Sequence, residues 1–321
     1  MNIDFERHNA EVKDVWQAYR AHEPLRVPCI VGTNTRYFLL GKNAPFAHID
    51  FKDYTEDPDV MFETQVRIHD WLRHHIRQDA PMGLPAEDEG WTVNVDFQNF
   101  YEAAWFGCDV FYCQGQVPDT HPRWQDPARK RELIERGVPD PFSNLMGKVR
   151  TYYEYFTEKA KSYTFKGRRV KKINPRGLGT DGPLTVAANV RGATELFTDF
   201  LEDPDYVRDL LSYITEATIV RIHAWRRFMG QPEKQEGFGF ADDSVQLLST
   251  QMYRDFVLPC HKRLREALST TTKGGSIHLC GDSTRHFPTI RDELGIRSFD
   301  TGFPVDFKKL RRDVGPDPRG L

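Results

Sequence analysis

The 321-residue chain lacks several features that would assign it to a specialised class of protein. No apolar run approaches the roughly 20 residues that a membrane-spanning helix needs, and 44 Lys+Arg against 47 Asp+Glu leave a formal charge of only −3. We therefore expect no membrane insertion and no charge-driven binding to nucleic acid or acidic lipid. The N-terminus, MNIDFERHNAEVKD, has no apolar stretch of the kind found in secretion signals, so the expected location is the cytoplasm.

Cysteine is scarce as well. The chain has five cysteines and no CxxC pair: Cys29, Cys108, Cys113, Cys260 and Cys280. This number and spacing argue against a disulfide framework and a zinc ribbon. Each cysteine is therefore expected to be a reduced thiol with a packing or chemical role.

Strand-like segments alternate with longer helical ones along the chain, without a linker between them, so we expect a single domain over residues 1–321. A helix is predicted over 205–229, where apolar residues recur at helical spacing after Asp203-Pro204 and before Gly230. Such alternation predicts parallel strands with crossover helices, in either a (β/α)8 TIM barrel or an open doubly wound sheet. The predicted strands cover residues 27–33, 91–97, 108–115, 183–190, 237–244, 274–282 and 297–302.

A glycine pattern at residues 177–182, GLGTDG, matches the GxGxxG fingerprint of dinucleotide-binding proteins. That fingerprint must follow a strand and open a helix. Here the basic segment RRVKKINPR precedes it and the strand-like PLTVAANV follows it, so we do not expect a dinucleotide site. Polar residues at the ends of several strands favour the barrel instead, since barrel enzymes assemble their sites at the carboxyl ends of the strands.

His278 and Cys280 form the clearest candidate for a metal site. Residues two apart in a strand point to the same face, so the imidazole and the thiol would project side by side. They would supply two of the three protein ligands of an open zinc site, and this pairing favours zinc over magnesium or calcium. The alternative is a buried strand in which Cys280 packs as a small apolar residue and His278 bonds to the backbone.

Two carboxylate positions at other strand ends are further candidates. Asp242 and Asp243 are adjacent, so at most one faces a site while the other caps a helix. Asp242 is our candidate general base, substrate-orienting group or acceptor near the metal; the alternative is that both aspartates only cap a helix and form a turn. Asp300 offers the same choice between a chemical role and a turn-forming one. Arg36 is a candidate for binding a substrate carboxylate, or it is simply a solvated arginine.

Three long segments together resemble the uroporphyrinogen decarboxylase superfamily, which also contains zinc-dependent cobamide methyltransferases. They are PLTVAANVRGATELFTDFLEDPDYVRDLLSYITEATI, FADDSVQLLSTQMYRDFVLPCHKRL and IHLCGDSTRHFPTIRDELGIRSFDTGFPVDFKKLRRDVGPD. The resemblance implies a (β/α)8 barrel with its site at the carboxyl-terminal mouth. Decarboxylases of this family have an arginine-rich segment after the first strand, whereas this chain has VGTNTRYFLLG and retains only Arg36.

The methyltransferase branch has His-x-Cys on a late strand, and His278 and Cys280 match it. The resemblance then implies a zinc ion that binds the acceptor thiol, and a methylated corrinoid, carried by a partner protein, as methyl donor. Two other functions stay open: decarboxylation of a porphyrinogen, which needs no metal, and a non-catalytic role in corrinoid binding.

The C-terminal region departs from the methyltransferase pattern, which has a further cysteine after His-x-Cys. No cysteine follows Cys280 here. Either the barrel lacks its last strand and helix, or this branch closes differently and completes the metal shell with a carboxylate such as Asp242.

Overall fold

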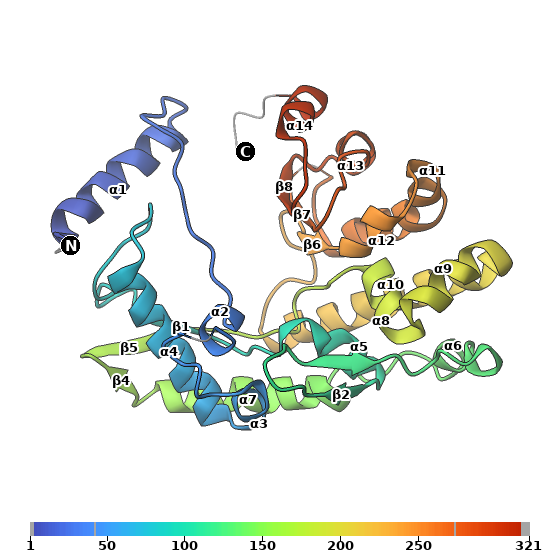
Figure 1. Ribbon diagram of the computed structural model, residues 1–321, viewed down its shortest axis with the longest axis horizontal. Helices are drawn as coiled ribbons and strands as arrows, with labels where there is room; N and C mark the ends of the chain where they lie inside the picture. The colour runs from blue at the N-terminus through green and yellow to red at the C-terminus, as the bar shows by residue number, and fades with distance from the viewer. Residues whose placement is uncertain (1–2, 42, 273, 316–321) are drawn as a thin grey trace. The chain divides into compact units, whose positions relative to one another are not determined.

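Helices and short strands alternate through the computed structural model, which describes residues 3–41, 43–272 and 274–315 (Figure 1). The expected α/β class is confirmed. The described strands form three small sheets, in the orders β1-β5-β4, β2-β3 and β6-β7-β8, and the closed barrel stays a prediction.

The chain divides into two compact units. Unit 1 comprises Met1–Gln98, Tyr112–Pro118 and Lys148–Arg176, and unit 2 comprises Asn99–Phe111, Asp119–Gly147 and Gly177–Leu321. The single domain expected over residues 1–321 is untested and stays a prediction.

Unit 1 is built on the parallel pair β1–β5, to which β4 adds antiparallel. Its helix α4 begins at Pro58, where the Asp57 side chain accepts hydrogen bonds from the N–H groups of Asp59 and Val60. The elements are α1 (Phe5–Arg20), α2 (Arg36–Leu39), α3 (Phe51–Glu56), α4 (Pro58–His75), β1 (Trp91–Asn94), most of α7 (Asn144–Ala160), β4 (Thr164–Phe165) and β5 (Arg168–Asn174).

Two sequence expectations about unit 1 are wrong. Residues 27–33 form no strand, because their backbone bonds to a loop: Cys29 N–H donates to the Asp79 carboxylate at 2.5 Å, and Asp79 N–H donates to the Cys29 carbonyl at 2.8 Å. The second is that no strand was expected in the basic segment before the glycine pattern, although this segment forms strand β5. It was missed because charged and polar residues occupy most of its positions and only Val170 is fully buried.

Unit 2 contains the parallel sheet β6-β7-β8, drawn in orange to red in Figure 1. Its helices and strands are α5 (Tyr101–Phe106), β2 (Asp109–Phe111), β3 (Asp119–His121), α6 (Glu132–Glu135), α8 (Pro183–Arg191), α9 (Ala193–Glu202), α10 (Pro204–Phe228), β6 (Phe240–Ala241), α11 (Thr250–Met252), α12 (Leu258–Leu268), β7 (Ser276–Leu279), α13 (Phe287–Leu294), β8 (Ser298–Thr301) and α14 (Phe307–Val314). Shorter turns of 3-10 helix lie at Gln98–Phe100, Pro127–Arg129 and Asp243–Leu247, and a π-helical turn lies at Tyr253–Val257.

The strand predicted at 183–190 is wrong, because this segment is helix α8. Gly182, with φ of 90°, turns the chain into the helix, and a Cβ there would lie 2.2 Å from the Ala241 carbonyl oxygen. Pro183 then occupies the first helical turn, where the missing N–H costs nothing. The tertiary contacts that stabilise this start come from residues far along the chain and leave no local signal.

The helix predicted at 205–229 is confirmed as α10. Asp203 caps it, accepting from the N–H of Tyr206, and two of its buried side chains, Arg221 and Arg226, are charged. Arg221 is completely buried and pairs with the Glu102 carboxylate of α5 at 2.5 Å, with a further bond to the Gly177 carbonyl oxygen. Although α10 is long, no helix in the described part of the chain is apolar enough over sufficient length to span a membrane.

We predict that Glu102→Ala lowers the free energy of unfolding by about 3–5 kcal/mol, because it leaves the Arg221 guanidinium buried without a counter-charge. Urea unfolding followed by tryptophan fluorescence measures the loss. The matched control is Glu216→Ala, which removes the half-exposed pair with Arg263 and is expected to cost less than about 1 kcal/mol. Equal losses in the two variants would contradict this account of the buried pair.

Candidate metal centre

The carboxyl ends of β6, β7 and β8 meet at one edge of their sheet. In the parallel register, Ala241 of β6 lies beside His278 of β7, and His278 lies beside Asp300 of β8. Side chains that follow each strand are thereby brought close together, although 59 positions separate the first from the last of these three residues in the sequence.

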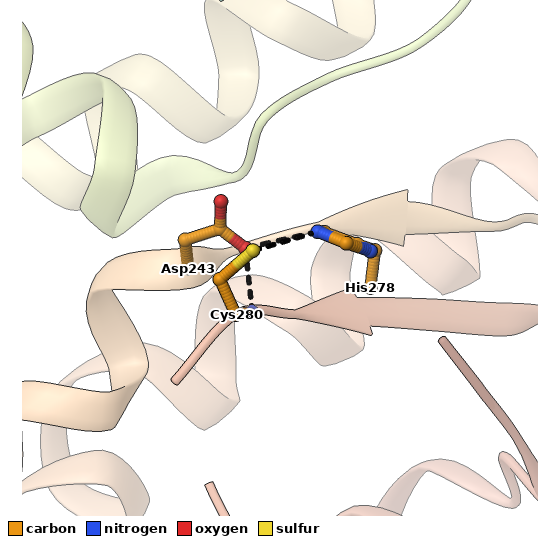
Figure 2. Close-up of side chains that lie close together, drawn as sticks. All are labelled: Asp243, His278 and Cys280. Atoms are coloured by element: carbon orange, nitrogen blue, oxygen red, sulfur yellow. Dashed lines mark hydrogen bonds and ion pairs between the residues drawn. The ribbon is translucent and has the colours of Figure 1, made fainter. Parts of the chain in front are cut away.

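Three potential metal ligands gather at this edge: Asp243, His278 and Cys280 (Figure 2). The Nε2 atom of His278 lies 3.1 Å from the Sγ of Cys280 and 3.5 Å from the Oδ1 of Asp243. One ligand atom from each residue can be chosen so that all lie within 4.8 Å of one another. The His278 and Asp243 side chains are each about one-third exposed, so a small molecule can reach them.

The remaining nitrogen of His278 contacts Asp300. Nδ1 lies 2.8 Å from the Asp300 Oδ2, so a proton on Nδ1 is donated to this carboxylate. In that tautomer the Nε2 lone pair points toward Cys280 and Asp243 and is available to a metal ion. Metal-binding histidines are commonly oriented by a carboxylate in this way.

Asp243 has two connections to the site. Its Oδ1 accepts a hydrogen bond of 2.8 Å from the Cys280 N–H, which fixes the turn after β7. The same carboxylate brings a negative charge beside the thiol and the imidazole. The 3-10 helix Asp243–Leu247 begins at this residue, and Asp242 alone separates it from β6.

The donor set fits zinc. Imidazole nitrogen, thiolate sulfur and carboxylate oxygen are all zinc ligands, and a catalytic zinc site takes three of them and leaves a fourth position open. Bond lengths of about 2.0–2.3 Å place neighbouring ligand atoms roughly 3.3–3.8 Å apart in a tetrahedron. The separations of 3.1 and 3.5 Å around His278 Nε2 are close to that range.

The Asp242 carboxylate is not part of this cluster of potential ligands. Its side chain is completely buried, and its carboxylate accepts from the N–H groups of Leu184 and Thr185 at the start of α8, at 3.2 and 2.8 Å. It also accepts from the Thr185 hydroxyl at 2.8 Å and lies 2.9 Å from His261 Nε2. The carboxylate that the structure brings to His278 and Cys280 is therefore that of Asp243.

The position of Asp242 also bears on the glycine pattern at 177–182. We rejected a dinucleotide site because the sequence indicated no strand before the glycines and no helix after them. That reason is wrong, since strand β5 precedes the glycines and helix α8 follows them. A dinucleotide phosphate would nevertheless need the N–H groups at the start of that helix. Asp242 already accepts from Leu184 and Thr185 there, so this helix end is filled by a side chain of the protein.

Arg36 belongs to unit 1, where it is the first residue of α2. Its guanidinium donates to the side-chain oxygen of Gln98 at 3.2 Å, and it forms no ion pair with any described residue. A role in binding a substrate carboxylate stays a prediction.

Asp243 is the residue that sequence reasoning passed over in favour of Asp242. The signal that identifies it is the register of β6 against β7: Ala241 pairs with His278, so the position two residues on, 243, falls beside Cys280 on the same face. Alternation alone shows that only one of the two aspartates faces the site. Without the register it does not show which.

A model of the family described as uroporphyrinogen decarboxylase (URO-D) matches residues 93–320. The chain belongs to this family. The match covers all four residues of the site, Asp243, His278, Cys280 and Asp300, and the expectation drawn from the sequence segments is confirmed.

Two proteins of Methanosarcina mazei are similar to this URO-D family chain. One is a methylated-thiol–coenzyme M methyltransferase, 29% identical over 143 residues, which make up 42% of this chain and 35% of that protein. The aligned part thus spans about a third of the relative's length. The other is the solved structure of a methyltransferase, with a TM-score of 0.54 and 17% identity over 95% of this chain and 80% of that one. The second likeness shows a shared fold.

We predict that Asp243→Asn weakens zinc binding more than about 100-fold, since even groups outside the ligand shell contribute 10- to 100-fold to metal affinity. The amide oxygen still accepts from the Cys280 N–H, so the turn should persist. Competition with a chromophoric chelator measures the dissociation constant. Asp282→Asn, at an exposed carboxylate in the following loop, is the control, and similar affinities for both variants would exclude Asp243 as a ligand.

Proposed function

We propose that this protein is a methyltransferase that transfers a methyl group from a corrinoid to a thiol activated by zinc. The observation that carries the proposal is the convergence of Asp243, His278 and Cys280 at the carboxyl ends of β6 and β7. The similarity to a methylated-thiol–coenzyme M methyltransferase over part of the chain supports it. The proposal includes a barrel closed around this site and a corrinoid-carrying partner protein.

Charge balance suits this chemistry. Cys280 as thiolate and Asp243 as carboxylate carry two negative charges, and His278 is a neutral ligand, so a divalent ion would balance the charge of its three protein ligands. A zinc ion held there would keep a coordinated substrate thiol deprotonated near neutral pH. The partial exposure of His278 and Asp243 leaves an approach for that thiol.

The reaction forms one bond and breaks another. The lone pair of the substrate thiolate forms the new sulfur–carbon bond, while the electron pair of the cobalt–carbon bond stays with the corrinoid cobalt. The residues of the chain hold the ligands in place. Asp300 keeps the proton on Nδ1 of His278, and Asp243 fixes the Cys280 backbone. In this proposal Arg36 binds an anionic group of the substrate, and Asp242 acts as a group outside the ligand shell.

We predict that the zinc-loaded protein transfers methyl from free methylcobalamin to a small thiol, and that chelation of the zinc abolishes the transfer. The change in the cobalamin absorption spectrum measures the rate. Cys280→Ser should remove at least about 99% of the activity, because it removes a ligand, whereas Cys113→Ser, at an exposed cysteine of unit 1, should retain it.

The same preparations separate the competing functions. Turnover of uroporphyrinogen by metal-free protein would replace our proposal with decarboxylation. Tight corrinoid binding without methyl transfer, in the presence of zinc, would support a non-catalytic role instead.

A further inference from the structure

One side chain of α8, that of Thr185, forms hydrogen bonds with both chain neighbours of Asp243. The Thr185 hydroxyl donates to the Asp242 carboxylate at 2.8 Å and accepts from the Ser244 N–H at 3.0 Å. A hydroxyl has one donor and two acceptor positions, so both bonds can exist at once. Thr185 therefore fixes the residue before Asp243 and the residue after it.

The preceding residue is itself anchored in a buried polar network. The four bonds to the Asp242 carboxylate come from Leu184 N–H, Thr185 N–H, the Thr185 hydroxyl and His261, which fills the acceptor capacity of a carboxylate. The other ring nitrogen of His261, Nδ1, lies 3.1 Å from the Tyr253 hydroxyl. Asp242, His261 and Tyr253 are all completely buried, so water does not compete for these bonds.

Burial and the nearby charge of Asp242 raise the pKa of Tyr253 well above its usual value, so its hydroxyl keeps its proton. Because the Asp242 carboxylate can only accept, His261 Nε2 is the donor in their bond, and in the neutral imidazole Nδ1 then accepts from the Tyr253 hydroxyl. Every hydrogen bond in this network thus has one defined direction, which favours a single arrangement.

This network is joined directly to the candidate metal ligands. The Asp242 N–H donates to the His278 carbonyl oxygen at 3.1 Å, and the Asp243 carboxylate accepts from the Cys280 N–H. A shift of the 242–244 backbone would therefore move Asp243 away from both other ligands.

We propose that Thr185 is a positioning residue for the metal site, aiming the Asp243 carboxylate at the position between His278 and Cys280 through its bonds to Asp242 and Ser244. The inference rests on the proposed function in that it takes these three residues as zinc ligands. It adds a residue outside the three ligands that determines how tightly the metal is held.

The test compares zinc affinity and the absorption spectrum of the cobalt(II)-substituted protein among variants of Thr185. Thr185→Val keeps the shape but removes both hydroxyl bonds, and we expect zinc affinity to fall by about 10- to 100-fold, with altered cobalt bands. Thr185→Ser restores the hydroxyl and should restore affinity and spectrum. If valine prevents folding, Thr185→Ala provides the same loss of the hydroxyl without added bulk.

Thr215→Val is the matched control, because Thr215 is a buried threonine of α10 whose hydroxyl donates to the Leu211 carbonyl oxygen. It should lower the melting temperature as Thr185→Val does, yet leave zinc affinity unchanged. If Thr185→Val binds zinc like the unmodified protein, this inference fails and the metal site stands. If the unmodified protein binds no zinc, the proposed function and this inference both fail.

Discussion

The buried carboxylate of Asp242 is the contact on which the organisation of unit 2 around the site depends. A carboxylate without water needs donors for its charge, and here they come from the start of α8 and from His261 of α12. Because Asp242 directly follows β6, this one side chain ties a strand to two helices. Removing it would leave buried N–H groups at the start of α8 without their partner.

That anchor explains why the adjacent aspartate is free for chemistry. Asp242 and Asp243 are neighbours, but one is completely buried with four donors and the other is about one-third exposed beside a thiol and an imidazole. The first stabilises the backbone and the second lies at the candidate metal position. Two chemically identical side chains thus have different roles, set by which face of the chain each occupies.

Part of this arrangement could be predicted from the sequence. Strand alternation was enough to place the His278 imidazole beside the Cys280 thiol, and Asp203-Pro204 with the apolar spacing after it predicted α10. The choice of Asp243 over Asp242 depends on the register between β6 and β7, which pairing across 37 residues of sequence decides. Likewise, α8 was mistaken for a strand. The carboxylate that accepts from the N–H groups at its start belongs to Asp242, which lies far along the chain. Local patterns carry no information about such distant partners.

The most direct measurement of the central claim is X-ray absorption at the zinc edge, on the zinc-loaded protein before and after addition of a small thiol. The account predicts one sulfur and otherwise nitrogen or oxygen neighbours at first, from Cys280, His278 and Asp243, and a second sulfur when the thiol binds. A sulfur count that stays unchanged when the thiol is added, or a zinc ion without any sulfur neighbour, would contradict thiol activation at this site.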